Sequence, residues 1–128
     1  MSINQNTICP LCRLTNDGEI LTRRVAEDDL LLIVDCQVCR VPMAVLKTHR
    51  AIFTEEEQEH IRGVFRDLLA TTPIPLTEDA YRFWKSVLMT DSDELIWVID
   101  WEQRRIPDHA HCHLRPRPFP GTTKWEKI

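Results

Sequence analysis

The chain lacks the features that mark several large protein classes. No apolar run approaches the ~20 residues that a membrane-spanning helix needs, and residues 1–7 do not have the pattern of a secretory signal peptide. Lysine and arginine number 16 against 20 aspartates and glutamates, so the net charge gives no reason to expect nucleic-acid binding. Repeats and low-complexity segments are also missing. We therefore expect a soluble, cytoplasmic protein that binds neither membranes nor nucleic acids.

What remains is the composition of an ordinary globular domain. The 128 residues, 43% of them apolar, suffice for one domain with a core that needs no disulfides. A capping box at Thr54 and Glu57 and an apolar stripe at helical spacing predict a helix that ends before Pro73. The other predicted elements are strands at 19–26, 30–35, 41–47, 95–101 and 109–115, a helix at 77–89 and an extended tail at about 116–128. This order predicts an α+β fold, an antiparallel or mixed sheet with two helices on one face.

Five cysteines in a chain without a signal peptide favour metal binding over disulfides. Cys9 and Cys12 form one Cys-x-x-Cys pair, and Cys36 and Cys39 form a second. Each pair can offer two thiolates to one ion, and two pairs complete a tetrahedral shell. The predicted hairpin between the pairs would bring them together, as in a zinc ribbon. We therefore predict one structural zinc held by knuckles at 9–12 and 36–39, and we assign Cys112 to the core.

Three histidines alternate with apolar residues near the C-terminal end, at His109, His111 and His113. Side chains alternate faces along a β-strand, so these three imidazoles would line one face of a strand. The residues between and after them would pack on the other face: Ala110, Cys112 and Leu114. A strand with this pattern is predicted to form the floor of a functional site.

This segment resembles the signature of the histidine triad (HIT) superfamily, His-φ-His-φ-His-φ-φ, often followed by Pro-Arg. Here the triad is followed by Leu114, Arg115, Pro116 and Arg117. Residues 42–49 are similar to the HIT strand that ends in Lys-x-His before a glutamate-rich helix, and an N-terminal Cys-x-x-Cys also occurs in zinc-bearing HIT proteins. The resemblance covers roughly residues 9–117 and implies a single HIT-like domain over residues 1–128.

The resemblance also implies an activity. HIT proteins are nucleotide hydrolases and transferases that act on the α-phosphate of a nucleotide conjugate, and their middle histidine forms a nucleotidyl-histidine intermediate. Carried over, His111 would be the nucleophile, while His109 and His113 would flank the phosphate. The nearby candidates for phosphate contacts are Arg104, Arg105, Arg115 and Arg117. Because HIT relatives are commonly homodimers, the implied partners are a nucleotide or nucleotide conjugate and a second copy of the chain.

Alternatives stay open for both the zinc and the function. Zinc-bearing HIT relatives often use two cysteines and two histidines, which here would be Cys9, Cys12, His49 and His109. An alternative function is that of a non-catalytic zinc-containing module that binds a nucleotide or a protein. A third interpretation is a metal-dependent hydrolase whose three strand histidines hold the catalytic ion. One zinc per chain fits the HIT interpretation, and two fit the metal-dependent hydrolase.

Overall fold

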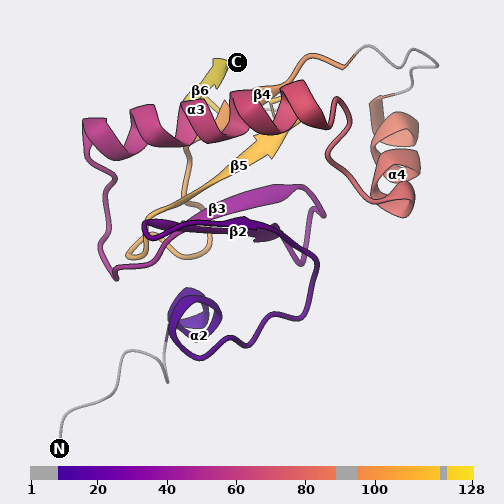
Figure 1. Ribbon diagram of the computed structural model, residues 1–128. Coiled ribbons are helices and arrows are strands. Elements are labelled where there is room, and N and C mark those ends of the chain that lie inside the picture. The colour runs from indigo at the N-terminus through magenta and orange to yellow at the C-terminus, as the bar shows by residue number, and fades with distance from the viewer. Residues whose placement is uncertain (1–8, 89–94, 119–120) are drawn as a thin grey trace, which may run out of the picture.

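A computed structural model describes residues 9–88, 95–118 and 121–128 and has an α+β architecture (Figure 1). The strands form one sheet in the order β1-β2-β3-β5-β4-β6, and every neighbouring pair is antiparallel. Along the chain the elements are α2 (Pro10–Asn16), β1 (Arg24–Glu27), β2 (Leu31–Asp35), β3 (Pro42–Leu46), α3 (Glu55–Thr71), α4 (Glu78–Leu88), β4 (Val98–Asp100), β5 (His111–Arg115) and β6 (Trp125–Lys127). The predicted α+β class is therefore confirmed.

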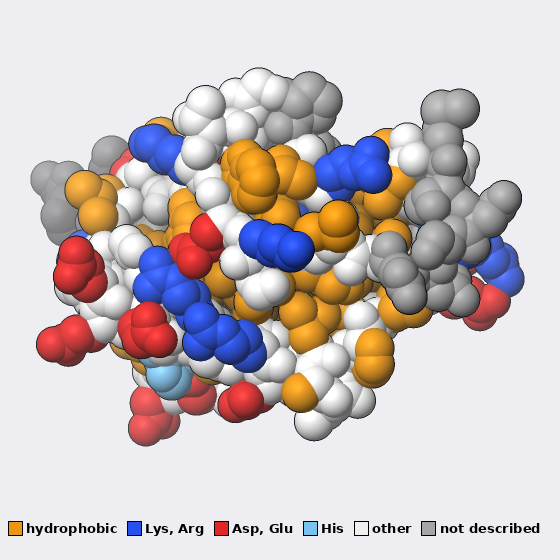
Figure 2. All heavy atoms as spheres, turned by 90° about the horizontal axis from the view of Figure 1, so that it is seen from above, with side chains coloured by type: hydrophobic (Ala, Val, Ile, Leu, Met, Phe, Trp, Pro, Cys, Tyr) orange, Lys and Arg blue, Asp and Glu red, His pale blue; other side chains and the backbone are white. Residues whose placement is uncertain are grey.

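Helices cover both faces of the sheet, not one face as the sequence predicted, because the unpredicted helix α2 packs opposite α3. The long helix α3 runs across one face, and the short helix α2 lies against the opposite face (Figure 1). Figure 2 looks onto the α3 side, where charged side chains of both signs surround exposed apolar ones. None of the helices in the described ranges has the length and hydrophobicity to cross a bilayer.

The sheet separates two apolar clusters. On the α3 side, Ile61 and Phe65 are fully buried against strand residues such as Ile33 and Leu114. On the α2 side, a smaller cluster contains Leu11 and both cysteines of the first pair, packed on β2 and β3. Residues that alternate along β2 and β3 therefore serve opposite cores, which is why both strands are buried along their whole length.

The histidine strand lies in the middle of the sheet, and its side chains alternate as predicted. Strand β5 pairs with β3, with Met43 opposite His113 and Val45 opposite His111. Cys112 and Leu114 belong to the core on the α3 side. His111 and His113 face the α2 side, where they line a cavity together with Met43.

Several predicted elements are confirmed, with shorter bounds for some. The capping box of α3 is present: the Thr54 hydroxyl accepts from the Glu57 amide at 3.1 Å, and the Glu57 carboxylate accepts from the Thr54 amide at 2.8 Å. The hairpin is β1 and β2, and the strand predicted at 95–101 is the three-residue β4. The predicted end of α4 at Met89 and the polar segment 1–7 lie outside the described residues.

Two elements differ from the prediction. Helix α2 begins at Pro10, directly after the first cysteine, because proline is well accommodated in the first helical turn. The tail was predicted to be extended over the surface, but it returns to the sheet as β6, which pairs with the edge of β4. A three-residue strand is too short for a recognisable alternation of apolar and polar residues in the sequence. Its pairing with β4 joins residues that are far apart in the chain.

Candidate functional site

A Cys2His2 cluster forms where α2 meets the sheet, and it contains Cys9, Cys12, His49 and His109. Cys9 precedes α2 and Cys12 lies in its first turn, while His49 follows β3 and His109 precedes β5. The Cys9 Sγ lies 3.3 Å from His109 Nδ1, and the Cys12 Sγ lies 3.1 Å from His49 Nδ1. The two Nδ1 atoms are 3.1 Å apart. Four donor atoms therefore converge on one point.

The donor set of this cluster fits zinc. With Zn–N near 2.0–2.1 Å and Zn–S near 2.3 Å, the edges of a tetrahedral shell are about 3.3–3.8 Å, close to the observed separations. His109 Nε2 lies 2.7 Å from the Leu46 carbonyl oxygen. A carbonyl only accepts, so Nε2 carries the hydrogen and Nδ1 turns its lone pair toward the thiols. This is the outer contact that orients a metal-binding histidine, and the cluster could hold a metal ion.

The protonation of this cluster follows from its burial. Burial and the neighbouring Cys9 thiol raise the pKa of Cys12 to about 11. Burial also lowers the pKa of His109, which keeps its imidazole neutral, the form that binds a metal. A cation between the thiols would favour the thiolates and release protons.

A second group, the Cys2His cluster, contains Cys36, Cys39 and His113. The two cysteines lie in the turn between β2 and β3, where the Cys36 amide donates to the Val41 carbonyl at 2.8 Å and the Arg40 amide donates to the Cys36 carbonyl at 2.9 Å. The hydrogen bond between the two thiols lowers the pKa of Cys36 to about 3 and raises that of Cys39.

The prediction of one four-cysteine shell does not match this arrangement. The structure places the two pairs in separate groups, the first with two histidines and the second with one. The physical reason is the register of the sheet. The turn at 36–39 lies at the start of β3, beside His113, whereas α2 brings Cys9 and Cys12 to the other end of β3, beside His49 and His109. His109 and His113 are four residues apart, which is roughly 13 Å along a strand.

His111 lies between the two clusters and lines a cavity of about 640 Å³. Its Nδ1 is 2.8 Å from the His109 carbonyl oxygen, so Nδ1 carries the hydrogen and Nε2 keeps its lone pair. Burial, more than any other cause, lowers the pKa of His111 to about 4. The His111 ring lies 5.7 Å from that of His113, whose pKa burial also lowers. The three triad histidines therefore have three different surroundings.

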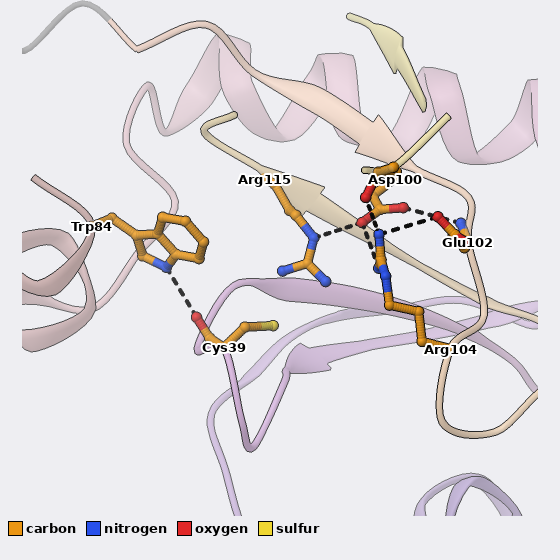
Figure 3. A network of polar contacts seen from close by, with 7 residues as sticks. Cys39, Trp84, Asp100, Glu102, Arg104 and Arg115 are labelled. Atoms are coloured by element: carbon orange, nitrogen blue, oxygen red, sulfur yellow. Dashed lines mark hydrogen bonds and ion pairs between the residues drawn. The ribbon is translucent and has the colours of Figure 1, made fainter. Parts of the chain in front are cut away.

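Of the arginines predicted to bind phosphate, three line the cavity and one does not. Arg115 is 3% exposed, and its Nε donates to Asp100 Oδ2 at 2.8 Å (Figure 3). Arg104 donates to the same oxygen at 2.9 Å. Arg104, Arg105 and Arg115 line the cavity, whereas Arg117 is exposed and is not among the lining residues.

Asp100 is a site residue that the sequence reasoning missed. It is completely buried and holds both Arg115 and Arg104. Burial alone would raise the pKa of Asp100, but hydrogen bonds from Arg115, the Glu102 amide and Arg104 lower it overall. A single acid inside the apolar run 95–101 is the signal that could have revealed it, because a buried carboxylate needs a buried cation.

No family model, no curated protein and no solved structure matches this chain. The features that bear on its function are the two clusters, the middle histidine and the arginines that line the same cavity.

Proposed function

We propose that this protein is a HIT-type nucleotide hydrolase or transferase in which His111 attacks the α-phosphorus of a nucleotide conjugate. The observation that carries the proposal is the hydrogen bond from His111 Nδ1 to the His109 carbonyl oxygen, at 2.8 Å. It fixes the ring in the tautomer whose Nε2 is nucleophilic. His111 also belongs to the cavity wall.

The cavity suits a ligand of nucleotide size. Its volume of about 640 Å³ lies within the roughly 300–1,000 Å³ that is usual for small-molecule sites. Its wall joins apolar side chains of α2, such as Leu11 and Leu14, to cationic side chains of the loop after β4, such as Arg105. Apolar surface on one side and positive charge on the other are what a base and a phosphate require.

The reaction would proceed in two displacements. The Nε2 lone pair of His111 forms a bond to phosphorus, and the leaving group departs with the electrons of its former bond and takes a proton from water. A second water then attacks phosphorus, its proton is released, and the electrons of the P–N bond return to Nε2. Arg115, fixed by Asp100, would stabilise the negative charge on the phosphoryl oxygens.

We also propose that the Cys2His2 cluster binds a structural zinc. The ion would supply no chemistry in the reaction and would join α2 to the ends of β3 and β5. Through His109 it would fix the carbonyl that sets the His111 tautomer, so one ligand of the structural ion lies two residues before the nucleophile, just ahead of β5.

The test is hydrolysis of adenosine 5′-phosphoramidate by the purified, zinc-loaded protein. We expect turnover by the wild type, loss of at least ~1,000-fold in His111→Ala, and an adduct of one AMP on His111 in mass spectra of quenched reactions. His60→Ala is the matched control, because His60 contacts Asp28 outside the cavity. Nucleotide binding without turnover would refute the enzyme and favour the binding module, and turnover that survives His111→Ala would refute the nucleophile.

A further inference from the structure

We infer that Cys36, Cys39 and His113 form a second metal site, for Zn²⁺ or a similar borderline-soft divalent cation, whose fourth coordination position opens into the cavity. This site is separate from the Cys2His2 cluster and goes beyond the proposed function. Only its role toward the substrate depends on that function.

The three ligands are held in place before any ion binds. Their donor atoms lie within 4.8 Å of one another. The turn that carries both thiols places Arg40 in the left-handed region at φ 62°, which is unfavourable for a residue with a long side chain. Strain of this kind persists only where surrounding contacts enforce it, and here the backbone bonds of the turn do so.

A contact from another element fixes the same turn. The Trp84 indole nitrogen of α4 donates to the Cys39 carbonyl at 2.9 Å, and both groups are buried (Figure 3). Helix α4 therefore holds the backbone of Cys39 in place through this hydrogen bond. A tight, externally anchored Cys-x-x-Cys turn is the arrangement that presents two thiolates to one ion.

The surroundings of His113 give an independent indication of a ligand. The residue is 7% exposed, and its Nδ1 is buried without a hydrogen-bond partner among the described residues. A buried imidazole nitrogen that makes no hydrogen bond is costly, and native proteins rarely keep one without a water or an ion. This imidazole is grouped with the thiols of Cys36 and Cys39, and three such donors together favour an ion.

The number of ligands separates the two clusters by role. Structural zinc sites are closed by four protein ligands, as in the Cys2His2 cluster, whereas catalytic sites keep three and leave one position for water or substrate. The Cys2His cluster has three within the described ranges, and all three line the same cavity as His111 and Arg115. The fourth ligand would therefore be a water molecule or an oxygen of an anion such as phosphate.

The charges around this position also favour an anion. Arg115 forms a hydrogen bond with Cys39 as well as the pair with Asp100. Its positive charge stabilises thiolates and would attract a phosphate oxygen from the same side. If the proposed function holds, the ion would bind an oxygen of the phosphate that His111 attacks.

The test is metal binding, which requires no nucleotide. We expect two zinc ions per wild-type chain by elemental analysis, and one in Cys36→Ser and in Cys9→Ser. This count does not favour a hydrolase whose three strand histidines hold the ion, because only His113 of the three belongs to the second cluster. Cys112→Ala is the matched control, because Cys112 faces the other core and should leave both ions in place. One ion in the wild type and an unchanged count in Cys36→Ser would overturn the inference, as would a Cys36–Cys39 disulfide in protein purified under reducing, metal-replete conditions.

A measurement on the wild type alone guards against variants that fail to fold. Titration with Co²⁺ should show thiolate-to-cobalt charge transfer for two equivalents, one for each cluster. Inorganic phosphate should then change the d–d bands of one equivalent and leave the closed cluster unaffected. Two equivalents that are both insensitive to phosphate would refute the open position. Because these readouts are independent of turnover, failure of the second site and failure of the proposed hydrolase are distinguishable.

Discussion

Replacing Asp100 by asparagine should destabilise the protein more than any change to a surface ion pair. Asp100 is completely buried and Arg115 is 3% exposed, so both partners of this ion pair are shielded from water. The substitution keeps the size of the side chain and removes its charge, which leaves the Arg115 guanidinium buried without its counter-ion.

The structure sets the size of the effect. Breaking a buried pair by removing one partner costs about 3–5 kcal/mol. We expect the lower end, about 3 kcal/mol, because the asparagine carbonyl can still accept from Arg115 Nε and Arg104 is partly exposed. For a chain of this length the loss corresponds to a fall in melting temperature of roughly 10 °C.

Urea unfolding followed by circular dichroism measures this difference. Glu78→Gln serves as the control, because Glu78 forms an exposed pair with Arg82 and should give no measurable change. An Asp100→Asn variant whose free energy of unfolding lies within about 0.5 kcal/mol of the wild type would show that the pair is not buried as described.

The pH dependence supplies a second check with a defined sign. Burial raises the pKa of Asp100, but the hydrogen bonds from Arg115, the Glu102 amide and Arg104 together lower the folded pKa below its ordinary value of 3.8. A group with a lowered folded pKa stabilises the protein above its unfolded pKa and loses that contribution as pH falls through the folded value. The difference between wild type and Asp100→Asn should thus be constant near neutral pH and shrink below about pH 4. A difference that grows in acid would contradict the assignment.

Three further outcomes follow from other parts of the fold. Glu57→Ala should lower the free energy of unfolding by about 1–2 kcal/mol through loss of the capping box with Thr54, whereas the exposed Glu56→Ala should not, as urea unfolding can show. Burial raises the pKa of Cys112, so mass spectra should show this thiol unmodified by iodoacetamide at pH 8 in the folded protein and modified in urea. A zinc chelator should lower the melting temperature of the wild type by several degrees and that of His49→Ala by less, because the variant has already lost one ligand of the Cys2His2 cluster.

The sequence predicts the local structure of this protein well where a pattern repeats. The apolar stripe and capping box define α3, and the alternation at His109–His113 correctly separates the imidazoles from Cys112. Both signals are local, since they depend on periodicity and on a cap within one turn. The short helix α2 and the strand β6 have no such signal, and only long-range packing and pairing define them.

The grouping of the cysteines could not be predicted from spacing. Two Cys-x-x-Cys pairs flanking a hairpin are typical of one shared ion, but that argument assumes that both pairs lie at the same end of the strands. Here residues 17–23 carry the chain from α2, on one face of the sheet, to the start of β1. The first pair is thereby placed at the opposite end of β3 from the turn at 36–39. The strand register therefore decides which histidines each pair of cysteines meets.

The two apolar layers of unequal size have a consequence for folding. The layer under α3 has a long, capped helix and needs no ligand, whereas the thin layer under α2 contains Cys9 and Cys12 among its few members. Withdrawing a cation from that layer would loosen α2 and the cavity wall while the helical side stays protected from hydrogen exchange. The α3 side would then stay folded without metal, whereas the α2 side and the cavity it lines would be fully assembled only when metal is available.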